Sequence, residues 1–151
     1  MKIQTRYFGQ VEYEEGEVIT FPEGIPGFPE ERQYLLLPFA GGENKMLCLQ
    51  SLTTPDLAFV LLDPFPFCPD YHPALEAAEL QEMGVSDVEE LFFYVLCVLR
   101  NPIGDSTVNL RCPVVINPHT LMARQIILGT EAYGMRHPLS ELEAKRGGAV
   151  C

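Results

Sequence analysis

The stretch Cys68-Pro69-Asp70-Tyr71-His72 places a thiol, a carboxylate and an imidazole close together. These are zinc-ligand types, and a Cys and a His four residues apart would make half of a tetrahedral site. The sequence has no Cys-x-x-Cys pair and no second close pair of ligands to complete the pattern. We therefore favour a loop that orders Tyr71 against the core, and we expect neither a metal nor a cofactor.

Three pairs of adjacent glutamates are the other candidates for chemistry: Glu14-Glu15, Glu30-Glu31 and Glu89-Glu90. General acid–base catalysis needs carboxyl groups that face each other across a pocket, whereas neighbours on a strand point to opposite faces. No Gly-x-Ser-x-Gly nucleophile motif is present. The glycine-rich loop at 24–27 carries prolines and an acid and leads toward a strand, unlike a phosphate-binding loop. The sequence favours a protein that is not an enzyme.

Composition narrows the choice of partners. The 151 residues carry a formal charge of -11, and 47% of them are hydrophobic. Such a chain is long and apolar enough to form one domain with a hydrophobic core, and its negative surface repels nucleic acid and anionic membrane. No apolar segment approaches the roughly 20 residues of a membrane helix, so we expect a soluble, cytoplasmic protein. A basic protein partner is the natural complement, although the charge can also serve solubility alone.

The five cysteines are irregularly spaced, and in a chain with no export signal they favour free thiols.

These residues sit on short elements separated by turn signals. Strands are expected at 2–8, in a hairpin at 11–21 that turns at 14–16, and at 33–39, 46–52, 57–62, 91–100, 107–117 and 120–128. A helix is expected at 73–83, followed by a short turn at 86–89 with Ser86 as its N-cap. The middle strands are apolar on both faces, which indicates burial on both sides. The prediction is a mostly β, single-domain, β-barrel-like fold of short antiparallel strands with one short helix, or else a tightly packed sandwich.

The stretch Phe-Pro-Glu-Gly-Ile-Pro-Gly-Phe-Pro-Glu-Glu at 21–31 combines stiff, apolar and acidic residues. Pro26-Gly27 suits the centre of a type II turn, where glycine takes a positive φ. Phe21, Ile25 and Phe28 have two interpretations. They fold inward and cap one end of the barrel, which apolar loop residues usually do. Alternatively, some of them stay exposed as a protein-docking ridge with Glu23, Glu30 and Glu31 as an acidic rim.

Several motifs resemble the flagellar assembly factor FliW family. They are the loop "FPEGIPGF", "LQSL" at 49–52, "LAFVLLDP" at 57–64, "PDY" at 69–71, "TVNLRCPVVIN" at 107–117 and "RQIIL…Y…RHPL" at 124–139. They occur in the family's order and together are far more specific than any one alone. The resemblance covers residues 1–139 as one domain. The polar segment 140–151 lies outside it, and we expect that segment to fray.

The resemblance implies a non-enzymatic, β-barrel-like regulator of flagellated bacteria that binds flagellin in the cytoplasm. It also implies binding to CsrA, a small basic RNA-binding repressor, so that flagellin synthesis follows flagellin export. We expect Glu12, Glu14, Glu15 and Glu17 to attract the basic partner, because an acidic field speeds its approach. Ile25 and Phe28, with Tyr71 near them, are the expected flagellin contacts. Asn109 either fixes a strand end or contacts a partner strand at an exposed edge.

Two other functions stay open at this stage. One is a flagellin export chaperone with no regulatory role, which needs the same flagellin site. The other is a barrel enzyme or carrier that holds a small ligand in an interior cavity. A core that is filled and has no converging polar groups would speak against the second.

Overall fold

The computed structural model describes residues 1–39, 46–102 and 105–140, and the predicted frayed tail lies outside them from Glu141 onward. The chain opens with a hairpin in which β1 (Lys2–Thr5) pairs with β2 (Gly9–Glu12). The hydroxyl of Thr5 donates to the Gly9 carbonyl at 2.8 Å and accepts from the Phe8 amide at 2.9 Å. This side chain closes a tight turn, so the prediction of one strand through Phe8 was wrong. The predicted hairpin at 11–21 was also wrong, because β2 pairs with β1 while residues 19–20 pair with later strands. Its expected turn at 14–16 is the short 3₁₀ helix η1 (Glu15–Glu17).

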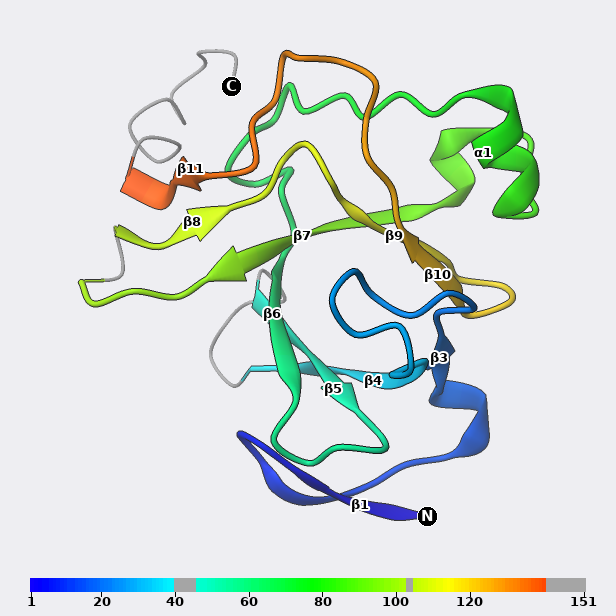
Figure 1. Cartoon of the computed structure of the whole chain (residues 1–151), viewed down its shortest axis with the longest axis vertical. Coiled ribbons are helices and arrows are strands. Elements are labelled where there is room, and N and C mark those ends of the chain that lie inside the picture. The colour runs from blue at the N-terminus through cyan, green and yellow to red at the C-terminus, as the bar shows by residue number, and fades with distance from the viewer. Residues whose placement is uncertain (40–45, 103–104, 141–151) are drawn as a thin grey trace.

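Seven strands form a closed barrel (Figure 1), as the apolar middle strands predicted. The strands are β3 (Ile19–Thr20), β4 (Gln33–Pro38), β5 (Met46–Ser51), β6 (Ala58–Leu62), β7 (Phe92–Val98), β9 (Val114–Asn117) and β10 (Met122–Gln125). The ring closes because β7 pairs with β6 along one edge and with β9 along the other. One pairing departs from the predicted antiparallel arrangement: β10 runs parallel to β3, with Met122 opposite Thr20.

Two further strands extend the sheet away from the ring. β8 (Thr107–Val108) pairs with the end of β7, and β11 (His137–Pro138) pairs with β8. Strand β7 therefore changes partner along its length, from β9 at Phe92–Tyr94 to β8 at Cys97–Val98. At that point the β7–β8 hairpin leaves the barrel (left in Figure 1).

Apolar side chains fill the barrel interior. Its buried members come from six of the seven strands and from the β3–β4 connection, and they include Ile19, Tyr34, Leu49, Leu61 and Val114. Full burial of side chains of this size stabilises the fold by roughly 1.5–3 kcal/mol each. A carrier or an enzyme with an interior site needs a cavity at this place, and packed side chains occupy it instead.

The outer wall carries two more apolar clusters. One packs Tyr71, Leu110 and Leu128 onto the outward faces of β6 and β7. The other packs Met83 and the region of α1 (Ala77–Glu82) onto Phe93 and Val115. Cys48, Cys97 and Cys112 are free buried thiols, as predicted, whereas Cys68 is disulfide-bonded, so that prediction was wrong for Cys68.

The helical segment is shorter than the predicted 73–83. It starts after Glu76, whose amide donates to the Glu79 carboxylate at 2.9 Å. A second 3₁₀ helix, η2 (Val88–Glu90), follows, and its N-cap is Asp87 rather than the predicted Ser86. The Asp87 carboxylate accepts from the Glu89 amide at 3.0 Å, which a serine one residue earlier is not placed to do.

Candidate partner-binding surfaces

We call residues 21–32, which join β3 to β4, the plug loop, because they lie across one opening of the barrel (Figure 1). The loop is a succession of turns: the Gly24 amide donates to the Phe21 carbonyl at 2.9 Å, and the Phe28 amide donates to the Ile25 carbonyl at 2.7 Å. Gly27 has φ +90°, as the predicted type II turn requires. At Gly24 (φ +70°) a Cβ would lie 2.6 Å from the backbone of Phe28 and Pro29, so only glycine fits there.

The apolar side chains of the plug loop divide between core and surface. Phe21 and Ile25 are 0% and 2% exposed within the interior cluster, whereas Phe28 is 41% exposed and packs edge-on against Phe59. Burial in the core removes Phe21 and Ile25 from direct contact with any partner, which corrects the expected ridge. Of the three, Phe28 alone offers apolar surface to a partner.

The three glutamates of the expected acidic rim also lie in different surroundings. Glu31 turns inward and accepts from the Ser51 hydroxyl at 2.8 Å and from the Thr54 hydroxyl, so it ties the plug loop to the β5–β6 turn. The nearby Tyr34 phenol has a raised pKa, first because it is buried and second because of the Glu31 charge. Glu30 remains exposed, and Glu23 forms an ion pair with Arg124 at 2.9 Å.

A groove of about 470 Å³ lies between the plug loop, α1 and the end of β10. Pro26 and Pro29 line one side, Glu79 and Glu82 of α1 line another, and Ile127 beside it is 65% exposed. The groove therefore joins apolar surface to acidic side chains. Sequence reasoning missed it because its walls come from segments about 50 residues apart in the chain, and no local pattern links them.

Tyr71 is not near the plug loop. It is 4% exposed in the outer-wall cluster, its hydroxyl donates to the Leu110 carbonyl at 2.6 Å, and its ring packs edge-on against Tyr133. Burial raises the pKa of the phenol. The alternative interpretation, that the 68–72 loop orders Tyr71 against the core, is therefore confirmed, and the expected flagellin contact at Tyr71 is corrected.

Asn109 also has a structural role. Its side-chain oxygen accepts from the Cys112 amide at 2.9 Å and closes the turn between β8 and β9. Its side chain is half-buried.

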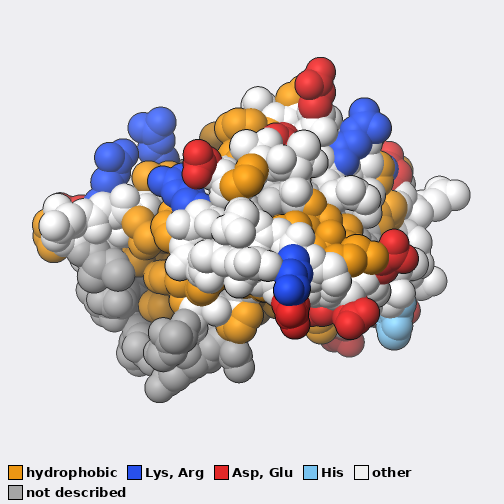
Figure 2. All heavy atoms as spheres, turned by 90° about the horizontal axis from the view of Figure 1, so that it is seen from below, with side chains coloured by type: hydrophobic (Ala, Val, Ile, Leu, Met, Phe, Trp, Pro, Cys, Tyr) orange, Lys and Arg blue, Asp and Glu red, His pale blue; other side chains and the backbone are white. Residues whose placement is uncertain are grey.

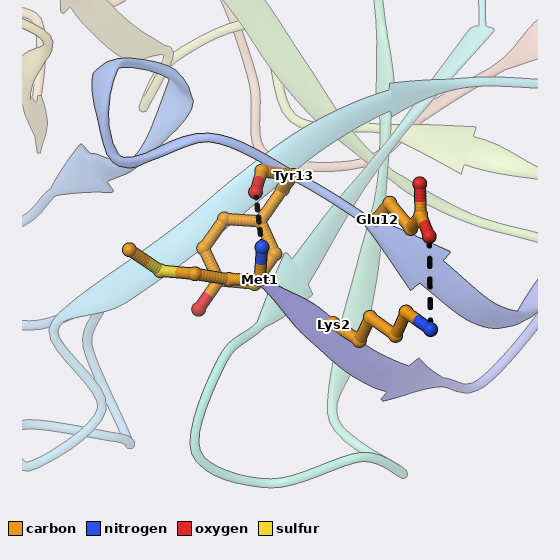
Figure 3. Close-up of polar contacts among 4 residues, drawn as sticks. All are labelled: Met1, Lys2, Glu12 and Tyr13. Atoms are coloured by element: carbon orange, nitrogen blue, oxygen red, sulfur yellow. Dashed lines mark hydrogen bonds and ion pairs between the residues drawn. The ribbon is translucent and has the colours of Figure 1, made fainter.

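Glu12, Glu14, Glu15 and Glu17, which we call the acidic group, are all exposed. They lie at one end of the N-terminal hairpin and on η1. Lys2 lies 3.8 Å from Glu12, and the N-terminal ammonium donates to the Tyr13 carbonyl at 3.1 Å (Figure 3). Glu17 also accepts from the Glu14 amide at 2.9 Å. The group thus keeps a net negative charge while one of its carboxylates is partly neutralised.

A second acidic surface is not among the partner-binding sites predicted from the sequence. Residues 76–90 contain six Asp and Glu residues and no Lys or Arg. They form α1, η2 and the turn between them, and all but Glu79 are exposed. The absence of basic residues from this segment is visible in the sequence and would have indicated an acidic surface. The face drawn in Figure 2 mixes acidic, basic and hydrophobic side chains.

Neither a metal centre nor a membrane span emerges from the described residues. In residues 1–39, 46–102 and 105–140, His, Cys, Asp and Glu side chains nowhere gather in threes so as to hold a metal ion. None of the helices there has the length and apolar character needed to cross a bilayer.

Comparison with known proteins identifies the family. A family model described as FliW protein matches residues 2–139. The chain belongs to the FliW family. The flagellar assembly factor FliW of Geobacillus thermodenitrificans (strain NG80-2) is 38% identical over 139 residues, which are 92% of this chain and 95% of that protein. The FliW of Geotalea uraniireducens (strain Rf4) is 42% identical over 146 residues, 97% of this chain and 88% of that protein.

The fold agrees with that assignment. A crystal structure of the flagellar assembly factor FliW matches this one with a TM-score of 0.85 and 37% sequence identity, covering 92% of this chain and 96% of that chain. The resemblance seen in the sequence motifs is therefore confirmed at the level of the FliW family and of its barrel.

Proposed function

We propose that this protein acts in flagellar assembly as a cytoplasmic binding protein that has no enzymatic activity. It binds flagellin and antagonises the translational repressor CsrA, so that flagellin synthesis follows assembly. Membership of the FliW family along residues 2–139 carries this proposal. The filled barrel interior supports binding at the outer surface rather than chemistry in an internal site.

The acidic group is the proposed attraction site for CsrA. Its four carboxylates are exposed, and a negative field of this kind raises the association rate of a basic partner. With -11 charges, the bound protein also repels RNA from CsrA, so antagonism does not require that the RNA site be covered.

Phe28 is the proposed anchor for flagellin. The ring is 41% exposed on a loop fixed by two positive-φ glycines and by the Glu31 hydrogen bonds. An aromatic side chain on a rigid loop contributes contact area with little loss of conformational entropy on binding. The neighbouring groove, with Ile127 exposed beside it, provides further apolar area for an amphipathic segment.

Co-purification followed by competition tests this function. The tagged protein is expected to retain purified flagellin and purified CsrA separately, and an excess of flagellin is expected to release bound CsrA. Retention of flagellin alone would leave an export chaperone as the function. Retention of neither would refute the proposal.

A further inference from the structure

A second groove lies beside the part of β7 that pairs with β8, whereas α1 packs near the part of β7 that pairs with β9. Its lining is basic, while the groove beside the plug loop has acidic side chains in its lining. The second groove measures about 350 Å³, within the range of roughly 300–1,000 Å³ that binding sites for small ligands occupy. Leu96 and Val98 of β7 and Met135 form its apolar part. Arg100, Arg136, Thr107 and Asn109 complete the lining. We call it the basic groove.

The charge of this groove departs from that of the chain. The sequence has 21 acidic against 10 basic residues, yet among the residues that the structure describes the groove is lined by two arginines and by no carboxylate. Within residues 1–39, 46–102 and 105–140, neither Arg100 nor Arg136 has a carboxylate within 4 Å, and this includes the neighbouring Asp105. Basic and hydrophobic side chains also lie side by side at the left end of Figure 2, the end at which the β7–β8 hairpin projects in Figure 1.

The hydrogen-bonding groups at the groove are mainly donors. Asn109 uses its side-chain oxygen on the Cys112 amide, so its amino group is the part left to donate. The two guanidinium groups donate only, and the Thr107 hydroxyl can donate as well. A ligand that matches this set must supply acceptors, and two cations favour acceptors that are negatively charged.

Backbone hydrogen bonds hold the walls in place. The Gly134 carbonyl accepts from the Leu110 and Arg111 amides, both at 3.1 Å, and the Gly134 amide donates to the His137 imidazole at 2.8 Å. These contacts fix the turn that carries Met135 and Arg136. On the other side, the Arg100 amide donates to the buried Ser106 hydroxyl at 2.8 Å. Both arginines therefore project from anchored backbone, which lowers the ordering cost of binding.

We propose that the basic groove binds a short peptide segment of a partner protein in which carboxylates alternate with aliphatic side chains. The carboxylates pair with Arg100 and Arg136, and an aliphatic side chain packs on Val98 and Met135, which are 52% and 50% exposed. Nucleic acid is disfavoured as the occupant because the rest of the chain repels it. This proposal is independent of the flagellin and CsrA assignments, since it concerns another surface and an acidic rather than a basic partner.

The test uses the full chain and a fluorescein-labelled peptide of three Leu-Glu repeats, with a Leu-Gln peptide as the neutral control. Fluorescence anisotropy is expected to show that the acidic peptide binds at least tenfold more tightly than the neutral one. The double change Arg100→Gln and Arg136→Gln is expected to lower its affinity at least tenfold, since it removes both cations that would pair with the carboxylates of the peptide. Val98→Ala is expected to lower it severalfold. The matched control Arg32→Gln, an exposed arginine of the plug loop, is expected to leave it unchanged.

A second measurement keeps the test valid should the double variant fold poorly. Adding the peptide to the wild-type chain is expected to shift the amide NMR signals of residues 96–100, 107–109 and 134–136. Equal binding of the two peptides, unchanged binding by the double variant, or shifts confined to other residues would overturn the proposal. So would tighter binding of a single-stranded RNA oligonucleotide at the same arginines. A dimer that the double variant abolishes in sedimentation experiments would make a second copy of this chain the occupant, which also overturns it.

Discussion

The plug loop and the N-terminal hairpin make different uses of similar residues. Both combine glutamates, glycines and aromatic side chains, and both were predicted to bind partners. The plug loop inserts Phe21 and Ile25 into the barrel interior and turns Glu31 inward. The hairpin has no side chain in the three core clusters, and its acidic group stays in solvent. Changes in the plug loop should therefore act first on stability, whereas changes in the acidic group should act on association.

The largest expected effect is a difference in stability between alanine variants of two phenylalanines in the plug loop. Phe21→Ala should lower the free energy of unfolding by about 3–5 kcal/mol, because it removes a fully buried ring from the interior. Phe28→Ala, the matched control, should cost about 1 kcal/mol or less because that ring is partly exposed. Denaturant titration measures both. Equal losses would mean that the loop does not plug the barrel.

A smaller difference in stability is expected between alanine variants of two glycines in the same loop. Gly24→Ala should cost about 3 kcal/mol, since the new Cβ meets backbone atoms at 2.6 Å and φ is +70°. Gly27→Ala shares the positive φ but has open space around the Cβ, so we expect about 1 kcal/mol. Thermal unfolding of the two variants provides the comparison. A Gly24→Ala protein as stable as Gly27→Ala would contradict the close approach of Gly24 to Pro29.

Alkaline pH should weaken the barrel rather than the hairpin. Burial raises the pKa of the Cys48 and Cys97 thiols to about 11, from an ordinary value of 9.0. Between these values the unfolded chain has lost protons that the folded chain keeps, so stability is full below pH 9 and falls as the pH rises toward 11. We expect a loss of about 2 kcal/mol between pH 8 and pH 10 for the two thiols together. Urea titrations at both pH values measure it, and stability that does not change with pH would argue against burial of these thiols.

The smallest effect on stability is expected at the acidic group. Changing Glu12, Glu14, Glu15 and Glu17 to lysine should alter the free energy of unfolding by less than about 1 kcal/mol, because all four are exposed. The association rate with CsrA should fall about tenfold at low salt and less at high salt. Stopped-flow mixing at two salt concentrations measures this rate. A rate indifferent to the substitutions and to salt would remove electrostatic attraction from the account.

The sequence predicted what depends on local chemistry. Strand positions between Gln33 and Val98, the presence of a helix before Gly84, and the Pro26-Gly27 turn follow from propensity and turn preferences. The single strand predicted at 107–117 was wrong, because a turn closed by Asn109 divides it into β8 and β9. Inward packing of Phe21 and Ile25 is the interpretation that physical chemistry favours, whereas the expected flagellin contact at Ile25 required that side chain to lie at the surface. Tyr71 shows the same limit, because it belongs to a family motif and yet is buried in a core cluster. Grooves built from distant segments depend on how the barrel closes, which no local pattern specifies.

The most direct test measures the affinity of flagellin and of CsrA for two variants, Phe28→Ala and the fourfold lysine variant of the acidic group, by isothermal titration calorimetry. The account predicts that Phe28→Ala weakens flagellin binding about tenfold and leaves CsrA binding intact, while the lysine variant does the reverse. Loss of both partners by either variant, or of neither by both, would contradict the separate roles assigned to the plug loop and the acidic group.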